Sequence, residues 1–202
     1  MTWIDTISYA ASKGRLRKLY DRVKGPDNNV DNIMMAHSLR PHTMEGHMSL
    51  YKFVLHHSAN SLPKWFLETL GVWVSSLNQC PYCVDHHFAG LQRLLNDDKK
   101  AVGIRNAIEA RDIDAAPLTP REKVALDYAR TLTQSPSSLT EHSIQSMREA
   151  GFSDGEILEI NQVSAYFSYA NRTVLGLGCN TDGDIIGLSP GNSDDPNDWN
   201  HT

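Results

Sequence analysis

Two cysteines separated by two residues constrain this chain more than any other feature. Cys80 and Cys83 follow an apolar run that is broken at residues 78–80, and Pro81 lies between them. Proline is favoured at the first position of a helix, because the N–H that it lacks would have no partner there. We therefore expect a helix that begins at Pro81, with Cys80 at its N-cap and Cys83 in its first turn.

The start of this helix is a suitable place for a reactive thiol. His87 follows Cys83 by four residues, so the two side chains share one helix face. A helix N-terminus carries partial positive charge and unpaired N–H groups, which favour a thiolate over a thiol. Cysteines in this spacing can have a pKa well below the free value of about 8.5. These features predict that the Cys80–Cys83 pair forms a thiolate near neutral pH.

Glu68 lies in the preceding helix, which we expect to begin at residues 61–63. Its neighbours at helical spacing include Lys64, Trp65 and Val72. A carboxylate among Trp and Val is a candidate for a raised pKa and for proton transfer. The other interpretation, an exposed glutamate paired with Lys64, is favoured by spacing alone because glutamate is rarely buried.

The arrangement as a whole resembles a known family. A glutamate twelve residues before Cys-x-x-Cys and a histidine four residues after it are typical of the carboxymuconolactone decarboxylase and alkylhydroperoxidase D-like family. The sequence of residues 74–87 is similar to that of the peroxidase-related branch of this family. Residues 150–160, followed by Ala165-Tyr-Phe167 and Asn171-Arg172, are similar as well. The resemblance covers roughly residues 30 to 180.

The resemblance implies roles for particular residues. Cys83 is implied to be the thiol that attacks peroxide, and Cys80 the resolving and more exposed thiol. Glu68 and His87 are implied to relay protons around them. Tyr82 stands where the founding hydroperoxidases carry a histidine, which is a departure from the family pattern. Further candidate site residues are Tyr82, His86, His57, Asn171 and Arg172.

The implied function is a thiol peroxidase of antioxidant defence. It would reduce alkyl hydroperoxides through a redox-active disulfide, Cys80–Cys83, with no metal and no other cofactor. An outside dithiol, lipoyl- or thioredoxin-like, would then reduce the disulfide. The resemblance also implies an all-helical subunit in a homo-oligomer.

Two alternatives stay open. A lactone decarboxylase-like lyase is the other activity in the family name, but such enzymes need no Cys-x-x-Cys. A zinc-binding helical module without enzymatic activity is the second, since Cys80, Cys83, His87 and Glu68 are acceptable zinc ligands. Against zinc, no second Cys-x-x-Cys or histidine pair completes a tetrahedral set at the usual spacing.

Composition excludes several other classes of function. The formal net charge is -5, which gives no electrostatic reason to bind nucleic acid or an anionic membrane surface. No run of about eighteen apolar residues predicts a membrane span, and the first residues do not read as a signal peptide. The 3 cysteines do not form a disulfide framework and fit a reducing compartment, so we expect the cytoplasm.

The remaining chain predicts an all-α fold. No segment shows clean period-two alternation, and capping boxes at Thr119 and Ser153 mark helix starts. Gly176 and Gly178 are expected to end the last helix. We predict one alkylhydroperoxidase D-like helical domain over residues 1–187, with an N-terminal arm over 1–29 whose helix packs on the body. Residues 188–202, rich in Pro, Gly, Asn and Asp, predict a flexible tail.

Two further features have ordinary explanations. The stretch from His37 to His57 is rich in histidine, but the spacing does not place these side chains on one helix face. It therefore predicts no local metal site. His56 or His57 could still border the thiol pocket. Cys179 lacks a histidine or cysteine neighbour in the sequence and is expected to be an ordinary small side chain. The histidines of the stretch are His37, His42, His47, His56 and His57.

Overall fold

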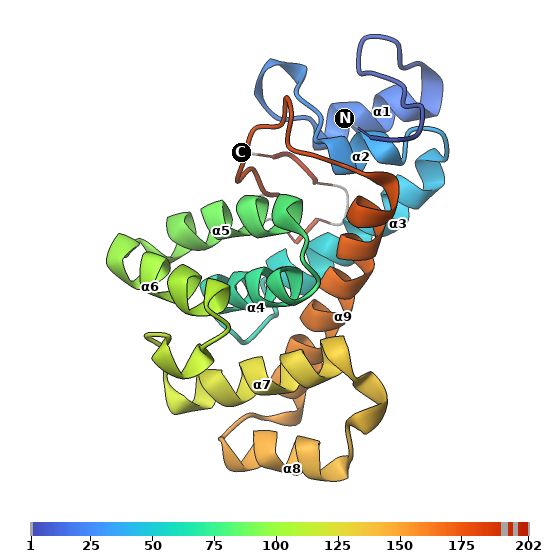
Figure 1. The fold of residues 1–202 in the computed structure, drawn as a ribbon. Coiled ribbons are helices and arrows are strands. Elements are labelled where there is room, and N and C mark those ends of the chain that lie inside the picture. Colours follow the sequence, from blue (N-terminus) through green and yellow to red (C-terminus); the bar gives the residue numbers. More distant parts are fainter. Residues whose placement is uncertain (1, 191–193, 196–197, 202) are drawn as a thin grey trace.

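The computed structural model describes residues 2–190, 194–195 and 198–201, and within these the protein is built from helices (Figure 1). One isolated bridge, between Pro190 and His201, is the single strand-like pairing among them. The prediction of an all-α fold is therefore confirmed. The α-helices are α1 (Gly14–Val23), α2 (Asn32–Ala36), α3 (Pro41–Tyr51), α4 (Lys64–Leu77), α5 (Pro81–Leu95), α6 (Asp98–Glu109), α7 (Pro120–Gln134), α8 (Glu141–Glu149) and α9 (Asp154–Leu177). Short 3₁₀ turns cover Pro26–Asn28, Ile113–Ala115 and Pro136–Ser138, and a π-helical turn, Lys52–His56, extends α3.

Helix α4 is the centre of the fold. It packs against α5, α7 and α9, and almost all of its side chains from Phe66 to Leu77 are buried. A helix that is apolar around its whole circumference has to be buried on all sides. The indole Nε1 of Trp73 donates a hydrogen bond of 2.8 Å to the carbonyl of Leu126, which joins α4 to α7. The thiol helix α5 lies beside α4, and the long helix α9 crosses the same core (Figure 1).

The close approach of α4 to α9 depends on Gly71. A Cβ atom at this position would lie 2.2 Å from the ring of Phe167. We expect Gly71→Ala to lower the free energy of unfolding by about 1–3 kcal/mol, because the added methyl overpacks the core. Urea unfolding measures the change. Gly46→Ala on α3, where nothing lies within 4 Å of the new atom, is the matched control. An equal effect of both substitutions would contradict this explanation, since Gly46→Ala should be neutral or stabilising.

Local sequence signals place most of the helix ends correctly. Helices α7 and α9 begin with the predicted capping boxes at Thr119 and Ser153. The C-cap of α9 is Gly178, whose φ of 64° is the left-handed conformation that glycine adopts readily. Gly176 lies inside the helix, so the prediction that it ends α9 is wrong. Glycine lowers helix propensity without forbidding a helix, and tertiary packing overrides it here.

The N-terminal arm packs on the body of the molecule, as expected. Helix α1 buries Leu16, Leu19, Tyr20 and Val23 and leaves its basic side facing out. The N–H of Trp3 donates to the carbonyl of Leu177 at 2.8 Å, at the end of α9.

The C-terminal segment makes more contacts than its composition indicates. Lys52, which is 0 % exposed, donates to the carbonyls of Asp195 and Asp198. Trp199 is 2 % exposed and stacks under the guanidinium of Arg22 at 3.6 Å. Composition describes an average tendency and does not predict that one tryptophan and one lysine bind this segment to the body. Residues 191–193, 196–197 and 202 of the expected tail lie outside the described residues, and its flexibility stays a prediction.

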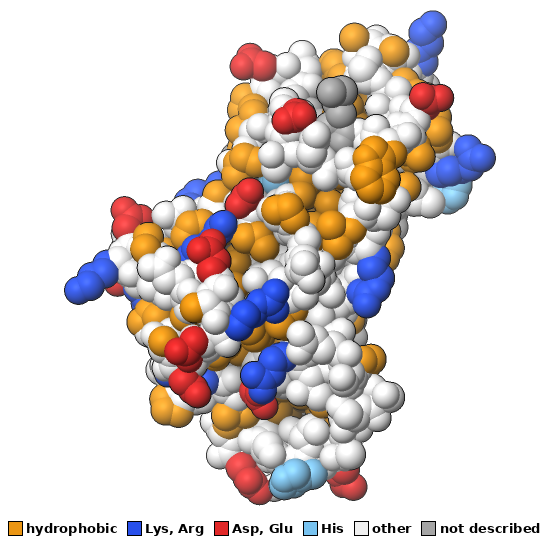
Figure 2. Space-filling view, in the orientation of Figure 1, with side chains coloured by type: hydrophobic (Ala, Val, Ile, Leu, Met, Phe, Trp, Pro, Cys, Tyr) orange, Lys and Arg blue, Asp and Glu red, His pale blue; other side chains and the backbone are white. Residues whose placement is uncertain are grey.

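The surface is mixed in charge. The face seen in Figure 2 carries Lys and Arg side chains interspersed with Asp, Glu and apolar side chains. Within the part of the chain that the structure describes, no helix has both the length and the apolar character needed to cross a bilayer.

Candidate functional site

A tight turn between α4 and α5 sets the position of the first cysteine. Gln79 adopts a φ of 57°, and the N–H of Cys80 returns to the carbonyl of Ser75 at 2.9 Å. Helix α5 then begins at Pro81 with Cys80 as its N-cap residue. The prediction for this helix start is therefore confirmed.

The two thiols face each other. Cys80 Sγ and Cys83 Sγ are 2.9 Å apart, and both cysteines are free rather than bonded in a disulfide. This separation is short enough for a bond between the sulfurs to form with little backbone movement. The geometry therefore suits a dithiol that closes to a disulfide and reopens.

The exposure of the pair differs from the expectation. Cys80 is 0 % exposed, whereas Cys83 is 3 % exposed and lines a cavity described below. The expectation that Cys80 is the more exposed thiol is wrong. The turn from α4 directs Cys80 toward the buried contact between α4 and α9, which spacing along one helix does not reveal.

The hydrogen bond between the thiols shifts their pKa values in opposite directions. The hydrogen bond between them lowers the pKa of Cys80, and the same bond together with burial raises the pKa of Cys83. In such a pair one proton leaves readily and the second is held, because the remaining thiol stabilises the thiolate. These directions favour the thiolate on Cys80, and a thiolate on Cys83 requires transfer of its proton to Cys80 across the 2.9 Å between the sulfurs.

Asn171 of α9 is part of this environment, and Arg172 is not. The Asn171 amide donates to Ser75 Oγ and accepts from Asn78 Nδ2, each at 2.9 Å. Its side chain is also close enough to lower the pKa of both thiols by hydrogen bonding. Arg172 is exposed, and its guanidinium donates to the carbonyl of Ser168 at 2.7 Å.

Glu68 and His87 form a buried pair between α4 and α5. The distance from Glu68 Oε2 to His87 Nδ1 is 2.7 Å, and Glu68 is 2 % exposed. The interpretation of Glu68 as an exposed partner of Lys64 is wrong, since Lys64 Nζ bonds the carbonyl of His56 instead. Gly90 on α5 makes room for the carboxylate, because a Cβ there would lie 3.3 Å from Glu68 Oε1.

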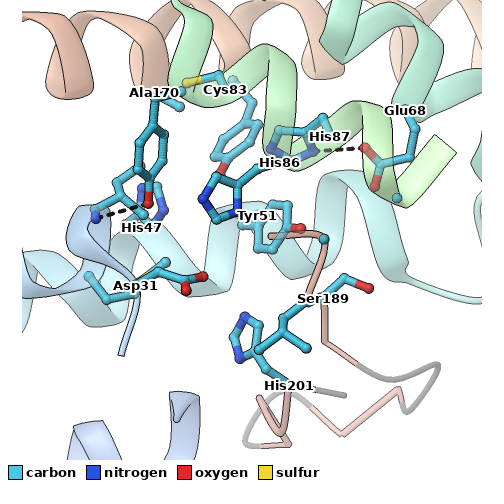
Figure 3. A pocket seen from close by; sticks show the side chains of 17 residues that line it. Asp31, His47, Tyr51, Glu68, Cys83, His86, His87, Ala170, Ser189 and His201 are labelled. Atoms are coloured by element: carbon cyan, nitrogen blue, oxygen red, sulfur yellow. Dashed lines mark hydrogen bonds and ion pairs between the residues drawn. The ribbon is translucent and has the colours of Figure 1, made fainter. Parts of the chain in front are cut away.

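The thiol pair opens onto a cavity of about 50 Å³ (Figure 3). Cys83 lies at one end, the Glu68–His87 pair lies at its side, and Ser189 and His201 of the C-terminal segment lie opposite Cys83. The remaining described lining residues are Asp31, Ile33, Met34, His47, Tyr51, Tyr82, His86, Gly90, Tyr166, Ala170, Gly187 and Leu188.

Tyr82 is held in place rather than free to exchange protons. Its hydroxyl donates to Asp184 Oδ2 at 2.7 Å and accepts from the N–H of Ile33 at 3.3 Å. Burial first, and then the charge of Asp184, raise the pKa of Tyr82 well above its ordinary value. Its ring contacts that of His86 at 4.5 Å, and His86 Nε2 lies 3.4 Å from the same carboxylate. Where the founding family members carry a histidine, this protein therefore has a fixed neutral hydroxyl.

The structure adds residues that sequence reasoning missed and excludes one that it proposed. Asp31, His47 and His201 line the cavity but lie far from the motif in sequence, and no local pattern marks them. Burial, with two nearby histidines adding to it, lowers the pKa of His47 to about 3, so this ring is neutral. His57 packs against Phe53 at 5.7 Å and does not line the cavity.

Metal ligation was a further alternative for these residues. Across residues 2–190, 194–195 and 198–201, no three His, Cys, Asp or Glu side chains are grouped so that they could hold a metal ion.

Comparisons with known proteins were made for families, curated proteins and solved structures. No family model matches the chain, and no curated protein matches it. Among solved structures, the alkylhydroperoxidase AhpD core of an uncharacterized peroxidase-related protein from Ralstonia eutropha JMP134 is similar, with a TM-score of 0.77 and 23% identity over 89% of this chain and 91% of that one. An uncharacterized peroxidase-related protein from Silicibacter sp. TM1040 has a TM-score of 0.76 and 24% identity over 90% and 93%.

A third similar structure has a more specific name. The debrominase Bmp8 has a TM-score of 0.66 and 17% identity over 82% of this chain and 85% of its own. A cysteine-to-alanine variant of that debrominase was solved in complex with 2,3,4-tribromopyrrole. At these identities the three structures show the fold. The protein has the alkylhydroperoxidase D-like fold, and the resemblance found in the sequence is confirmed at that level.

Proposed function

We propose that this protein is a dithiol peroxidase that reduces small organic hydroperoxides. The observation that carries the proposal is a free thiol pair with sulfurs 2.9 Å apart, of which one member, Cys83, lies on a cavity wall. The buried Glu68–His87 pair shares that cavity. A nucleophile, a resolving group and a proton-handling pair therefore meet at one place.

The reaction needs only these groups and the substrate. The Cys83 thiolate attacks the terminal oxygen of the hydroperoxide, the O–O bond breaks, and the alkoxide takes a proton and leaves as an alcohol. Cys83 is then a sulfenic acid. The thiol of Cys80 displaces its hydroxyl as water, and a disulfide forms. One hydroperoxide and two thiols give one alcohol, one water and one disulfide.

His87 is placed to supply the proton that the alkoxide needs. Its Nδ1 is held by Glu68, which orients the ring from α4. Phe167 supports the ring edge-on at 4.5 Å. A general acid held in this way contributes through its fixed orientation as well as its proton. The disulfide returns to the dithiol by exchange with an outside dithiol, lipoyl- or thioredoxin-like.

A thiol count tests the first half of this cycle. Addition of one equivalent of tert-butyl hydroperoxide to the reduced protein should remove two of its 3 thiols, as titrated after unfolding. Peptide mapping should place the new disulfide between Cys80 and Cys83. Retention of all three thiols, or a disulfide that includes Cys179, would contradict the proposed pairing.

Removal of the charge on Glu68 should slow the reaction. We expect Glu68→Gln to reduce the rate of thiol oxidation about 100-fold and to shift its pH profile, because His87 loses its anionic partner. Stopped-flow measurement across pH gives both quantities. Glu109→Gln, which breaks an exposed pair with Arg105, is the control. An unchanged pH profile in Glu68→Gln would show that the buried pair is structural.

A second candidate function is favoured by the aromatic walls of the cavity. The rings of Tyr51 and Tyr166 stack with centroids 5.5 Å apart, and Tyr82 lines the same space. Such walls suit a flat ring, and the structurally similar debrominase has been solved with a brominated pyrrole. The same dithiol could replace bromine by hydrogen, releasing bromide and a proton and forming the disulfide. Bromide release from 2,3,4-tribromopyrrole, with a dithiol as reductant, tests it.

A further inference from the structure

The carboxylate of Asp31 is unusual for its position. Asp31 is the N-cap residue of α2, and an N-cap aspartate normally accepts a hydrogen bond from the helix N–H groups. Here the side chain makes no such bond, and the backbone carbonyl accepts from Met34 and Met35 instead. Among the described residues, none donates a hydrogen bond to this carboxylate. Figure 3 shows it pointing into the cavity, between His86 and His201.

At neutral pH this group carries charge. Burial raises the pKa of Asp31 to about 6, with His86 opposing and Asp184 adding to the rise. The carboxyl is therefore ionised at pH 7 and above. Because Asp31 lines the cavity and has no hydrogen-bond donor among the described residues, its negative charge is available to whatever enters.

None of the ion pairs among the described residues includes Asp31. Among the described lining residues, Glu68 is paired with His87 at 2.7 Å, His86 Nε2 lies 3.4 Å from Asp184, and none is a lysine or arginine. Burial lowers the pKa of His47 to about 3 and that of His201 to about 4, so both are neutral at pH 7. Arg93, which is not among the described lining residues, donates hydrogen bonds to the carbonyl of Gly187 and the hydroxyl of Ser189.

We propose that Asp31 determines which molecules reach Cys83: the cavity admits small uncharged molecules and excludes anions. The inference deepens the proposed function, on which it rests for the identity of the substrate, by naming the class as uncharged organic hydroperoxides. Hydroperoxides that carry a carboxylate are poor substrates. The same repulsion disfavours the carboxylate-bearing lactones that a decarboxylase would need.

Two alkylating reagents of nearly equal size test the selectivity directly. Iodoacetamide is neutral and iodoacetate is an anion, and both transfer a carbon to a thiolate as iodide leaves. The Cys80→Ser variant serves as the background, so that Cys83 is the remaining thiol of the pair. The rate at Cys83 is followed by peptide mapping, which separates it from Cys179. The rate with iodoacetamide is divided by the rate with iodoacetate. This ratio is then divided by the same ratio measured for 2-mercaptoethanol, which removes the intrinsic difference in reactivity between the two reagents.

We expect the normalised ratio to favour iodoacetamide by about tenfold, as one charge at short range would produce. Adding Asp31→Asn should bring the ratio close to that of the free thiol. Asp31→Glu, which keeps the charge, should keep the selectivity. Asp85→Asn is the matched control, since it removes one charge from an exposed site on the same helix as Cys83. Circular dichroism confirms the fold of each variant.

The contradicting results are specific. A normalised ratio near one in the background variant would show that the cavity does not select by charge. Equal ratios in Asp31→Asn and Asp85→Asn would show that Asp31 is not the cause. Failure of both reagents to reach Cys83 would show that the cavity is closed to small molecules. None of these results requires peroxide turnover, so a failure of the proposed peroxidase function is distinguishable from a failure of this inference.

Discussion

Cys83→Ser should reduce the rate of reaction with tert-butyl hydroperoxide by ~10³-fold or more, because Cys83 is the one thiol among the described residues of the cavity wall. A serine hydroxyl remains protonated at neutral pH and does not attack the O–O bond. The rate is measured by stopped-flow loss of hydroperoxide with the reduced protein.

Cys179→Ser is the matched control for this variant. Cys179 is buried away from the cavity lining, and burial raises its pKa to about 11, so it is a poor nucleophile at pH 7. The control should retain the wild-type rate. If Cys83→Ser reacted as fast as the control, the assignment of the attacking thiol would be wrong.

Cys80→Ser should separate the two halves of the cycle. The first attack by Cys83 should still occur, since that thiol lines the cavity, but no second thiol lies 2.9 Å away to condense with the product. We expect a sulfenic acid to accumulate and steady-state turnover to fall by about 100-fold. A 1,3-diketone that traps sulfenic acids, followed by peptide mapping, measures its yield at Cys83.

The outcome that would contradict the pairing is equally clear. Wild-type turnover in Cys80→Ser, without a trapped sulfenic acid, would mean that an outside thiol resolves Cys83 directly. In that case the short distance between the sulfurs would be incidental to the reaction.

Local chemistry explains why much of the fold could be predicted from the sequence. The preference of proline for the first helical position places the start of α5 at Pro81, and the capping boxes place the starts of α7 and α9. These signals act between residues three or four apart, so they can be identified without tertiary information.

The cavity could not be predicted in the same way. Asp184 reaches Tyr82 from 102 positions along the chain, and Asn32 reaches Asp184 across 152. Such contacts depend on how the helices pack, and local sequence patterns do not predict them. Burial of Glu68 is also tertiary, which is why spacing favoured an exposed glutamate. The family resemblance implies a proton-relay role for Glu68 together with His87, and the structure places these two side chains 2.7 Å apart.

The measurement that tests the central claim most directly is steady-state consumption of tert-butyl hydroperoxide by the wild-type protein, with dihydrolipoamide as reductant. A dithiol peroxidase should consume many equivalents of hydroperoxide per protein molecule, and Cys83→Ser should consume none above the uncatalysed rate. No turnover by wild-type protein whose thiols are confirmed free would contradict the peroxidase. The fold would stand, and the thiol pair would need another reaction.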